Sequence, residues 1–398
     1  MDNTVCVLGL GYIGLPTALM IAASDVLVYG VDIKPQLIKQ IEEQSIQINE
    51  PGLLELLKYV KLKGKFKALD KPCAAEVYII TVPTPFKQDK TPDLSFVYAA
   101  FKSISSLLKK GDLIILESTV PVGTTNEMCE YLQGIRSDLR IASEACGNPD
   151  IHVAFCPERV IPGNIINELK ANERIVGGVT IACAQKASKI YENFIGARCH
   201  LTNAKTAEMT KLTENCFRDV NIAFANELSL LCHDEKLNVD EVISLANRHP
   251  RVNILRPGVG VGGHCIAVDP WFLIKENESK TKLLKTARNV NEAKTDWVIA
   301  QIKRRFELSD KTKILCCGLA YKPNTDDLRE SPALKVYHEL RETFGEKVFY
   351  NDDYISQSIE GKADRDSILD TENLVVLLVA HDYFLDKNTH THLDLNFC

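Results

Sequence analysis

The first two hundred residues alternate short apolar runs with segments of helical periodicity. Apolar, β-branched runs predict strands over residues 4–8, 26–31, 77–82, 113–117, 152–155 and 174–176. Helical spacing of apolar positions predicts helices over residues 15–23, 34–44 and 96–108. Alternation at these intervals is typical of a doubly wound parallel sheet, because a parallel crossover needs about a dozen residues or more.

The pattern changes near residue 200 and changes back near residue 313. Residues 204–233 keep a helical period without proline or glycine, and residues 240–246 and 283–305 also look helical. The pattern then predicts a strand and turn at 313–321, a helix at 331–340 and strands at 347–350 and 374–380. The sequence does not decide whether a last strand forms at 393–397. We therefore expect a large parallel-sheet domain over 1–200, a central helical domain over 201–308 and a smaller parallel-sheet domain over 309–398.

Charge and cysteine usage narrow the class of protein. The net charge of −6 gives no basic footprint and argues against nucleic acid as a partner. The 13 cysteines are scattered without a CxxC pair or a ligand cluster, so we expect no metal and a reducing, cytoplasmic location. No leader pattern opens the sequence and no apolar run reaches the roughly 18 residues of a membrane span, so no membrane partner is expected.

A glycine-rich turn follows the first predicted strand and opens the first helix. Gly9 suits a tight turn, Gly11 lets a pyrophosphate approach the backbone, and Gly14 allows close packing of helix on strand. Asp32, about 20 residues on, should bind the adenosine ribose and repel a 2′-phosphate, which favours NAD over NADP although Lys34 lies nearby. The alternative is a glycine-rich turn without a ligand. The expected cofactor contacts of this turn are Gly9, Gly11, Tyr12, Ile13 and Gly14.

Two threonines follow later strands of the same predicted sheet. Thr84 lies in VPTPF and Thr119 in ESTVPVGTT. Cofactors lie across the carboxyl ends of such strands, so both threonines are candidates for the nicotinamide side. Taken alone, a threonine at such a position is more often a turn or cap residue.

One cysteine and one helix face carry candidate chemistry. Five glycine or proline residues lead to Cys265, with His264 beside it and Asp269 one turn later if the segment is helical. Nearby positive charge makes a thiol nucleophilic, although an ordinary loop cysteine is the alternative. Lys211, Asn215 and Arg218 are spaced i, i+4 and i+7 and so share one helix face. The alternative for that face is a solvated one, with mixed-sign pairs partly provided by Glu208 and Asp219.

Six segments in order then carry a family resemblance over nearly the whole chain. They read GLGYIG, STVPVG, FCPERVIPG, AEMTKLTENCFRDVN, GVGGHCIAVDP and GLAYKPNTDDLRESPA. Together they resemble the UDP-glucose/UDP-mannose (UDP-sugar) 6-dehydrogenase superfamily. ANRHPRVNIL and AVDPW are most similar to the UDP-N-acetyl-D-mannosamine dehydrogenases of bacterial surface polysaccharide synthesis. The resemblance implies an α/β fold of two Rossmann-like doubly wound parallel-sheet domains joined by a central helical dimerisation domain, with NAD, a UDP-sugar and a homodimer or higher homo-oligomer.

The resemblance also implies roles for single residues. Cys265 matches the nucleophile that traps an aldehyde as a thiohemiacetal and carries the thioester after a second hydride transfer. The other implied catalytic residues are Lys211 as general acid/base, Asn215 at the oxyanion, Asp269 in water activation or lysine orientation, and Glu158 in hydrolysis. The implied substrate contacts are Arg159, Val160, Lys211, Asn215, Arg218, His249, Arg251, Gly262 and Lys322, and Arg329 is an implied cofactor contact.

Other functions stay open at this point. Ala267 and Val268 replace the proline and lysine usual in UDP-glucose dehydrogenases, and the chain after His381 is shorter than expected. UDP-N-acetylglucosamine and UDP-glucose are alternative substrates. A two-electron 3-hydroxyacid dehydrogenase needs neither the Cys265 loop nor a third domain. A non-catalytic NAD-binding regulator would not need Lys211 or Cys265.

Overall fold

A computed structural model describes residues 4–48, 50–161, 163–385 and 394–397 of the chain. The chain divides into two compact units, Met1–Thr213 and Glu214–Cys398. The boundary lies within one long helix, α8 (Ala204–Asp234). None of the helices in the described ranges has the length and apolar character needed to cross a bilayer. The division into domains 1–200, 201–308 and 309–398 stays a prediction.

The first unit is built on an eight-stranded sheet, counted over the described residues. Its strands are β1 (Thr4–Leu8), β2 (Leu27–Val31), β3 (Phe66–Leu69), β4 (Val77–Ile80), β5 (Leu113–Leu116), β6 (His152–Phe155), β7 (Arg174–Gly178) and β8 (Cys199–Asn203). They lie in the order β3-β2-β1-β4-β5-β6-β7-β8. All neighbours are parallel except β6 and β7, which pair antiparallel. The predicted doubly wound sheet is confirmed, with this one antiparallel pair as a departure.

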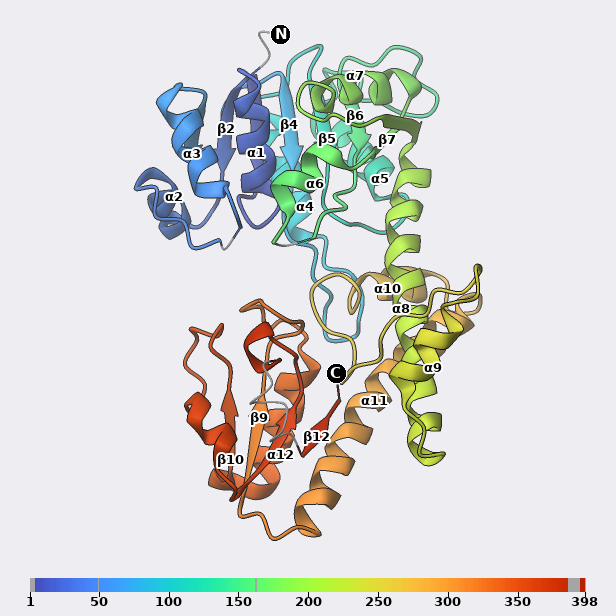
Figure 1. Cartoon of the computed structure of the whole chain (residues 1–398). Helices are drawn as coiled ribbons and strands as arrows, with labels where there is room; N and C mark the ends of the chain where they lie inside the picture. The colour runs from blue at the N-terminus through green and yellow to red at the C-terminus, as the bar shows by residue number, and fades with distance from the viewer. Residues whose placement is uncertain (1–3, 49, 162, 386–393, 398) are drawn as a thin grey trace. The chain divides into compact units, whose positions relative to one another are not determined.

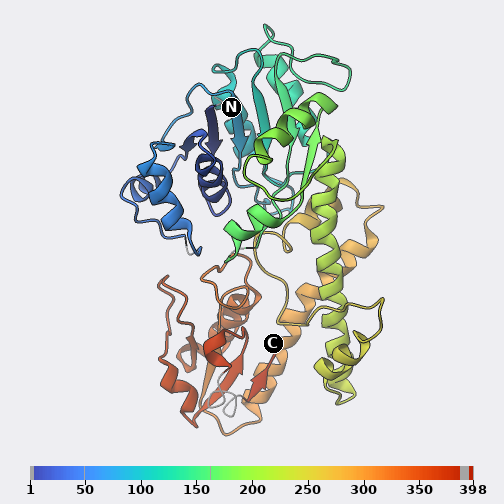
Figure 2. The same ribbon diagram turned by 45° about the horizontal axis from the view of Figure 1, so that its top comes forward.

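Helices cover both faces of this sheet (Figure 1 and Figure 2). They are α1 (Gly14–Ala23), α2 (Pro35–Glu42), α3 (Leu53–Leu62), α4 (Ser95–Ser105), α5 (Thr124–Ile135), α6 (Ile165–Ala171) and α7 (Ile181–Tyr191). Because side chains alternate along a strand, Val5 and Val7 of β1 pack with α1, α3 and α7, while Cys6 and Leu8 pack with α4 and α5. The sheet is therefore buried on both faces, as a parallel sheet requires.

The second unit combines helices with a smaller, fully parallel sheet. Its helices are α9 (Val239–Ala246), α10 (Asp269–Glu276), α11 (Lys282–Glu307) and α12 (Pro332–Phe344), besides the larger part of α8 and the short 3₁₀ turns Gly345–Lys347, Arg365–Leu369 and Asp382–Phe384. The strands β9 (Lys313–Cys317), β10 (Val348–Asn351), β11 (Asn373–Leu377) and β12 (Leu395–Asn396) lie in the order β10-β9-β11-β12. The last strand therefore forms, over two residues that pair with β11.

Both sheets begin with the same glycine turn, a repeat that the sequence alone did not reveal. Gly9 and Gly318 have φ of +94° and +83°, a backbone region that favours glycine. The Gly9 N–H donates to the carbonyl of Val31, and the Gly318 N–H donates to that of Asn351. In each case the carboxylate after the second strand, Asp32 or Asp352, accepts the backbone N–H of the residue after the glycine. The two turns are thus held by equivalent contacts.

Candidate active site

The glycine turn after β1 has the shape expected of a phosphate-binding loop. A side chain at Gly9 would meet the carbonyl oxygen of Thr81 at 2.8 Å, and one at Gly14 would meet the carbonyl oxygen of Gly9 at 1.8 Å. Gly11, in contrast, is exposed and has open space around its would-be side chain. Packing therefore requires glycine at the first and third positions, while the middle position leaves the backbone open at the start of α1, where a pyrophosphate is stabilised by N–H groups. The residues present fit NAD.

Asp32 has a structural contact that sequence reasoning missed. Its Oδ2 accepts the N–H of Leu10 at 2.9 Å, and its Oδ1 accepts the N–H of Lys34 at 2.9 Å. The carboxylate thus holds the glycine turn as well as lying half-exposed at the end of β2. Ile33 follows it with 80% of its surface exposed, the apolar neighbour that a purine base needs.

The two predicted threonines follow the adjacent strands β4 and β5. The hydroxyl of Ser118 donates to the carbonyl oxygen of Val82 at 2.7 Å, which ties the segment of Thr84 to that of Thr119. Both threonines are half-buried. Thr81, which sequence analysis did not select, donates its hydroxyl to the carbonyl oxygens of Leu8 and Gly9. The carboxyl ends of β1, β4 and β5 are therefore one connected edge.

Glu158 is held at this end of the sheet by a buried arginine. Arg174 donates to Oε2 of Glu158 at 3.0 Å, and its guanidinium lies 3.6 Å from Oε1 of Glu117. The hydroxyl of Tyr191 donates to the same Glu117 oxygen at 2.6 Å. Burial raises the pKa of Glu117 to about 7, although Arg174 opposes this, and the other Glu117 oxygen is buried without a hydrogen bond among the described residues. Sequence reasoning missed Glu117 and Arg174 because neither stood in a recognisable pattern.

Lys211 lies in the first turns of α8, whose position is fixed by a buried carboxylate one turn earlier. Glu208 is fully buried and accepts the N–H groups of Gly123 and Thr125, at 2.6 and 2.8 Å, and the hydroxyl of Thr125. It thereby caps the exposed N–H groups at the start of α5. The alternative of a solvated face with surface pairs does not hold for Glu208, nor for Asp219, which is buried and accepts from Arg288 at 2.8 Å. The Lys211 side chain is half-buried.

In the second unit, Cys265 lies on the turn that leads into α10. Its carbonyl oxygen accepts the N–H of Asp269 at 2.8 Å, so the predicted one-turn spacing of these two residues is real. The buried carboxylate of Asp269 in turn accepts a hydrogen bond from the amide of Asn215 on α8. The structure therefore brings Cys265, Asp269 and Asn215 together.

The glycines before Cys265 pack closely against residues 321–332. A side chain at Gly262 would meet the carbonyl oxygen of Glu330 at 2.5 Å, and one at Gly263 would meet the ring of Tyr321 at 2.7 Å. The Gly263 N–H also donates to the carbonyl of Arg329 at 2.9 Å. Glycine is thus required because two backbones run in contact. This loop also contains Lys322, which is half-buried next to the Tyr321 ring.

The remaining predicted substrate contacts are exposed cations around α8 and α9. Arg218, His249 and Arg251 are exposed, and the two arginines provide positive charge there. Two asparagine side chains hold the loop that contains His249 and Arg251. The amide of Asn247 donates to the carbonyl oxygen of Ile254 and accepts its N–H, and the amide oxygen of Asn221 accepts the N–H of Leu255 at 3.0 Å.

The predicted site residues fall into two groups by unit. The first unit contains Gly9, Gly11, Tyr12, Ile13, Gly14, Asp32, Thr84, Thr119, Glu158, Arg159, Val160 and Lys211. The second contains Asn215, Arg218, His249, Arg251, Gly262, Cys265, Asp269, Lys322 and Arg329.

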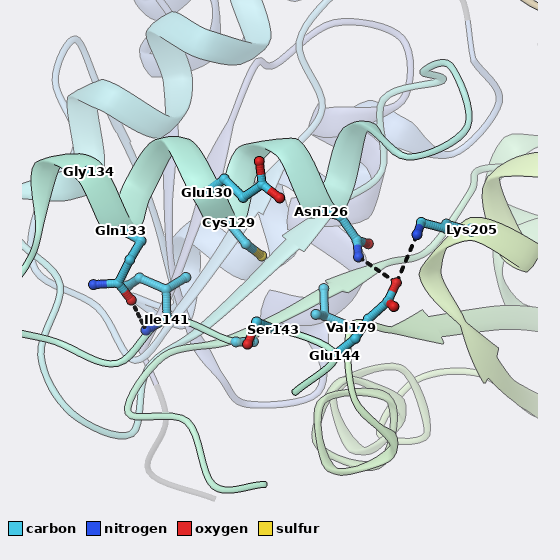
Figure 3. Close-up of a pocket in the computed structure, with 11 residues that line it drawn as sticks. Asn126, Cys129, Glu130, Gln133, Gly134, Ile141, Ser143, Glu144, Val179 and Lys205 are labelled. Atoms are coloured by element: carbon cyan, nitrogen blue, oxygen red, sulfur yellow. Dashed lines mark hydrogen bonds and ion pairs between the residues drawn. The ribbon is translucent and has the colours of Figure 1, made fainter. Parts of the chain in front are cut away.

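A cavity of about 600 Å³ in the first unit contains no residue of either group (Figure 3). It lies along α5 and residues 141–144. Glu144 at its edge accepts from Asn126 at 2.9 Å and pairs with Lys205 at 2.8 Å. Gln133, also in its lining, accepts the N–H of Ile141 at 3.0 Å, and we assign the cavity no ligand.

Comparison with known proteins matches the chain along nearly its whole length. Models of the UDP-glucose/GDP-mannose dehydrogenase family match as the NAD binding domain at residues 3–195, the central domain at 205–293 and the UDP binding domain at 315–395. A UDP-N-acetyl-D-mannosamine dehydrogenase of Campylobacter jejuni is 49% identical over 96% of this chain and 97% of its own. An NDP-N-acetyl-D-galactosaminuronic acid dehydrogenase of Ralstonia solanacearum is 46% identical over 97% and 93%. The solved structure of a UDP-D-ManNAc dehydrogenase from Pyrococcus horikoshii superposes with a TM-score of 0.90 at 40% identity, covering 98% of this chain and 92% of that one.

Proposed function

The chain belongs to the UDP-glucose/GDP-mannose dehydrogenase family, and we propose that it oxidises the primary alcohol of UDP-N-acetyl-D-mannosamine to a carboxylate with NAD. The observation that carries the chemistry is the grouping of Cys265, Asp269 and Asn215 at the start of α10. Two relatives, each aligned with 96% of this chain, are named as dehydrogenases of that substrate. The reaction belongs in a reducing cytoplasm, where a nucleophilic thiol stays reduced, and its product suits surface polysaccharide synthesis.

The overall reaction consumes one alcohol, two NAD⁺ and one water, and yields one carboxylate, two NADH and three protons. NAD, when bound, accepts a hydride from the carbon that is oxidised. The thiolate of Cys265 adds to the aldehyde, and the resulting thiohemiacetal loses the second hydride and becomes a thioester. Water then cleaves the carbon–sulfur bond and returns the thiol. Covalent trapping keeps the reactive aldehyde on the protein between the two oxidations.

The remaining residues take roles that follow from their chemistry. Lys211 moves the alcohol proton and donates to the oxyanion, and Asn215 adds a neutral donor, one of its N–H groups being fixed by Asp269. An oxyanion donor of this kind contributes about 2.7–4 kcal/mol to the transition state. Glu158, held by Arg174, orients the hydrolytic water. Arg218, Arg251 and Lys322 provide positive charge for the diphosphate, which a chain of net charge −6 must supply locally.

Other UDP-sugars form the second candidate, favoured by the 46% identical relative named for an N-acetylgalactosaminuronic acid. UDP-glucose is disfavoured by Ala267 and Val268, which are buried at 4% and 7% exposure beside Cys265. A charged lysine at the second of these positions could not be accommodated there without a partner.

The test is a panel of UDP-sugars incubated with the protein and NAD, with NADH counted per sugar consumed. We expect UDP-N-acetyl-D-mannosamine to be oxidised fastest, with two NADH per sugar and no free aldehyde. A different preferred sugar would revise the substrate but keep the chemistry. A ratio of one NADH per sugar would refute the four-electron reaction.

We also propose that the chain forms a homodimer through α8. Phe217, Phe224 and Leu231 recur every seven residues along this helix and are 67%, 53% and 60% exposed. Their spacing forms one apolar stripe, and a matching stripe on a second copy is the occupant that a two-fold axis provides. Phe224→Glu should convert the dimer to a monomer in sedimentation analysis. Leu62→Glu, which places the same charge at an exposed leucine of α3, should leave the dimer intact. A wild-type monomer at micromolar concentration would refute this proposal.

A further inference from the structure

The residue before the proposed nucleophile belongs to a cluster of charges that sequence analysis left without a role. Nδ1 of His264 lies 3.7 Å from Oδ2 of Asp327. Arg329 donates to both oxygens of the same carboxylate, with Nε 2.9 Å from Oδ1 and a terminal nitrogen 2.6 Å from Oδ2. The backbone bond from Gly263 to Arg329 fixes the two loops side by side. His264 and Asp327, 63 positions apart in the sequence, are thus held together next to Cys265.

The charges in this cluster can be assigned. Burial lowers the pKa of His264, but Asp327 and the Cys265 thiol outweigh this effect and raise it to about 9. Burial raises the pKa of Asp327, but His264 and Arg329 bring it well below its usual range. At neutral pH the cluster therefore contains two cations and one anion, a net charge of +1 beside Cys265. Two other ionisable residues lie nearby: the Tyr321 ring packs at Gly263, and Asp269 follows Cys265 by one turn.

We propose that His264, held by Asp327, is a positioning residue whose imidazolium favours the thiolate of Cys265. This rests on the proposed function, in which Cys265 is the nucleophile. A neighbouring cation stabilises a thiolate directly. Asp327 acts through His264, because it keeps the ring charged, and Arg329 acts through Asp327, because it fixes the carboxylate.

The experiment measures the thiol itself and needs no sugar. Iodoacetamide reacts with the thiolate, so the rate at which the Cys265 peptide is alkylated, followed by mass spectrometry from pH 5 to 10, gives the pKa of this thiol. Peptide resolution is necessary because Cys73, Cys146 and Cys199 are also partly accessible. His264→Gln should slow alkylation of Cys265 at pH 7 about tenfold, because the loss of a neighbouring opposite charge typically disfavours the ionised form by at least that factor.

A second variant has a different signature. Asp327→Asn removes the anion that keeps His264 charged, so the Cys265 alkylation rate relative to wild type should fall from pH 6 to pH 8 as the ring loses its proton. His264→Gln should instead be slow throughout this range. His338→Gln, the same change at an exposed histidine of α12, is the matched control and should leave the profile unchanged. Thermal melting of each variant shows whether it is folded.

The outcomes separate this inference from the proposed function. Superimposable Cys265 profiles in wild type and folded His264→Gln would overturn the role of His264. A wild-type thiol that ionises like a free cysteine would overturn it too. If the alkylation profile shifts as expected but no UDP-sugar yields NADH, the charge cluster stands and the proposed function fails.

Discussion

Replacing Glu117 by glutamine should make the protein more stable at neutral pH, although it removes one partner of a buried ion pair. Glu117 is fully buried at the end of β5, 3.6 Å from the guanidinium of Arg174. Glutamine has nearly the same shape and still accepts the Tyr191 hydroxyl at the same oxygen. Arg174 keeps Glu158 as its counter-ion at 3.0 Å. Glu117→Gln therefore reproduces the neutral form of the native side chain.

The size of the effect follows from the pKa of Glu117. Burial raises this pKa from 4.5 to about 7. Between these two values the folded protein retains a proton that the unfolded chain has released, so its free energy of unfolding falls as the pH rises. Well above pH 7 the loss is complete, and about 2.5 pKa units at about 1.4 kcal/mol each give about 3–4 kcal/mol. Glu117→Gln should match wild type near pH 4.5 and exceed its stability by that amount at pH 8.

The assay is urea unfolding followed by circular dichroism at several pH values from 4.5 to 8. Fluorescence is unsuitable because both tryptophans, Trp271 and Trp297, lie in the second unit, whereas Glu117 lies in the first. Glu55→Gln, at an exposed carboxylate of α3, is the matched control and should leave the pH dependence unchanged. If Glu117→Gln and wild type have the same pH dependence, Glu117 is ionised in the folded protein and the reasoning is wrong.

Three further predictions concern the proposed chemistry. Cys265→Ser should stop turnover and leave sugar attached to the protein as an ester, which intact mass measurement detects; a variant with the normal rate would show that Cys265 is a structural loop residue. Lys211→Ala should lose roughly 10²–10⁴-fold in kcat, the usual range for an acid–base group; a smaller loss would exclude that role. NADP should be a poor substitute for NAD because we propose that Asp32 binds the ribose, and comparable kcat/KM values for the two would contradict this proposal.

Elements with strong periodicity were predictable, and those that depend on tertiary context were not. All six strands predicted in the first domain form, with ends shifted by at most two residues, and α8 begins and ends as its period indicates. Strand β8 was missed because its residues are largely exposed and polar, so no apolar run marks it. Helix α5 was missed because its start is stabilised by Glu208, 84 positions from Thr124, and not by a cap of its own.

The candidate active site shows the same difference between local features, which were predictable, and tertiary contacts, which were not. The glycine turn and the Cys265 loop could be identified because Gly9, Gly14 and Gly262 each meet backbone within 3 Å, so these positions accept only glycine, and glycines are visible in the sequence. The partners of the charged residues were not visible, because Glu158 with Arg174 and His264 with Asp327 meet only through the fold. Charge spacing on α8 suggested surface pairs, whereas Glu208 and Asp219 are buried with partners from other elements.

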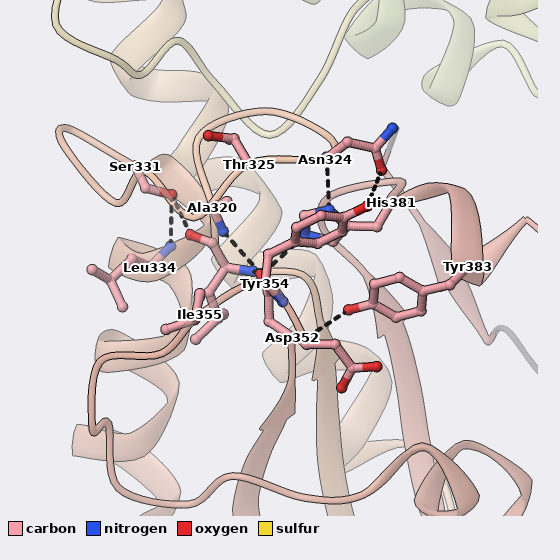
Figure 4. Close-up of polar contacts among 12 residues, drawn as sticks. Ala320, Asn324, Thr325, Ser331, Leu334, Asp352, Tyr354, Ile355, His381 and Tyr383 are labelled. Carbon is pink, nitrogen blue, oxygen red and sulfur yellow. Dashed lines mark hydrogen bonds and ion pairs between the residues drawn. The ribbon is translucent and has the colours of Figure 1, made fainter. Parts of the chain in front are cut away.

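The glycine turn common to both sheets explains why one of them suits the dinucleotide and the other does not. Asp32 is half-exposed, so a ribose can reach a carboxylate that also holds the turn. Asp352 occupies the equivalent place but is completely buried, and His381, also completely buried, lies 3.0 Å from the oxygen that accepts the N–H of Leu319 (Figure 4). Nδ1 of His381 accepts the N–H of Asn324, so the ring closes the position a ribose would need and fixes residues 319–324 instead. We therefore propose that a nucleotide at the second sheet is bound through that loop, where Lys322 lies, in the region that matches the UDP binding domain of the family.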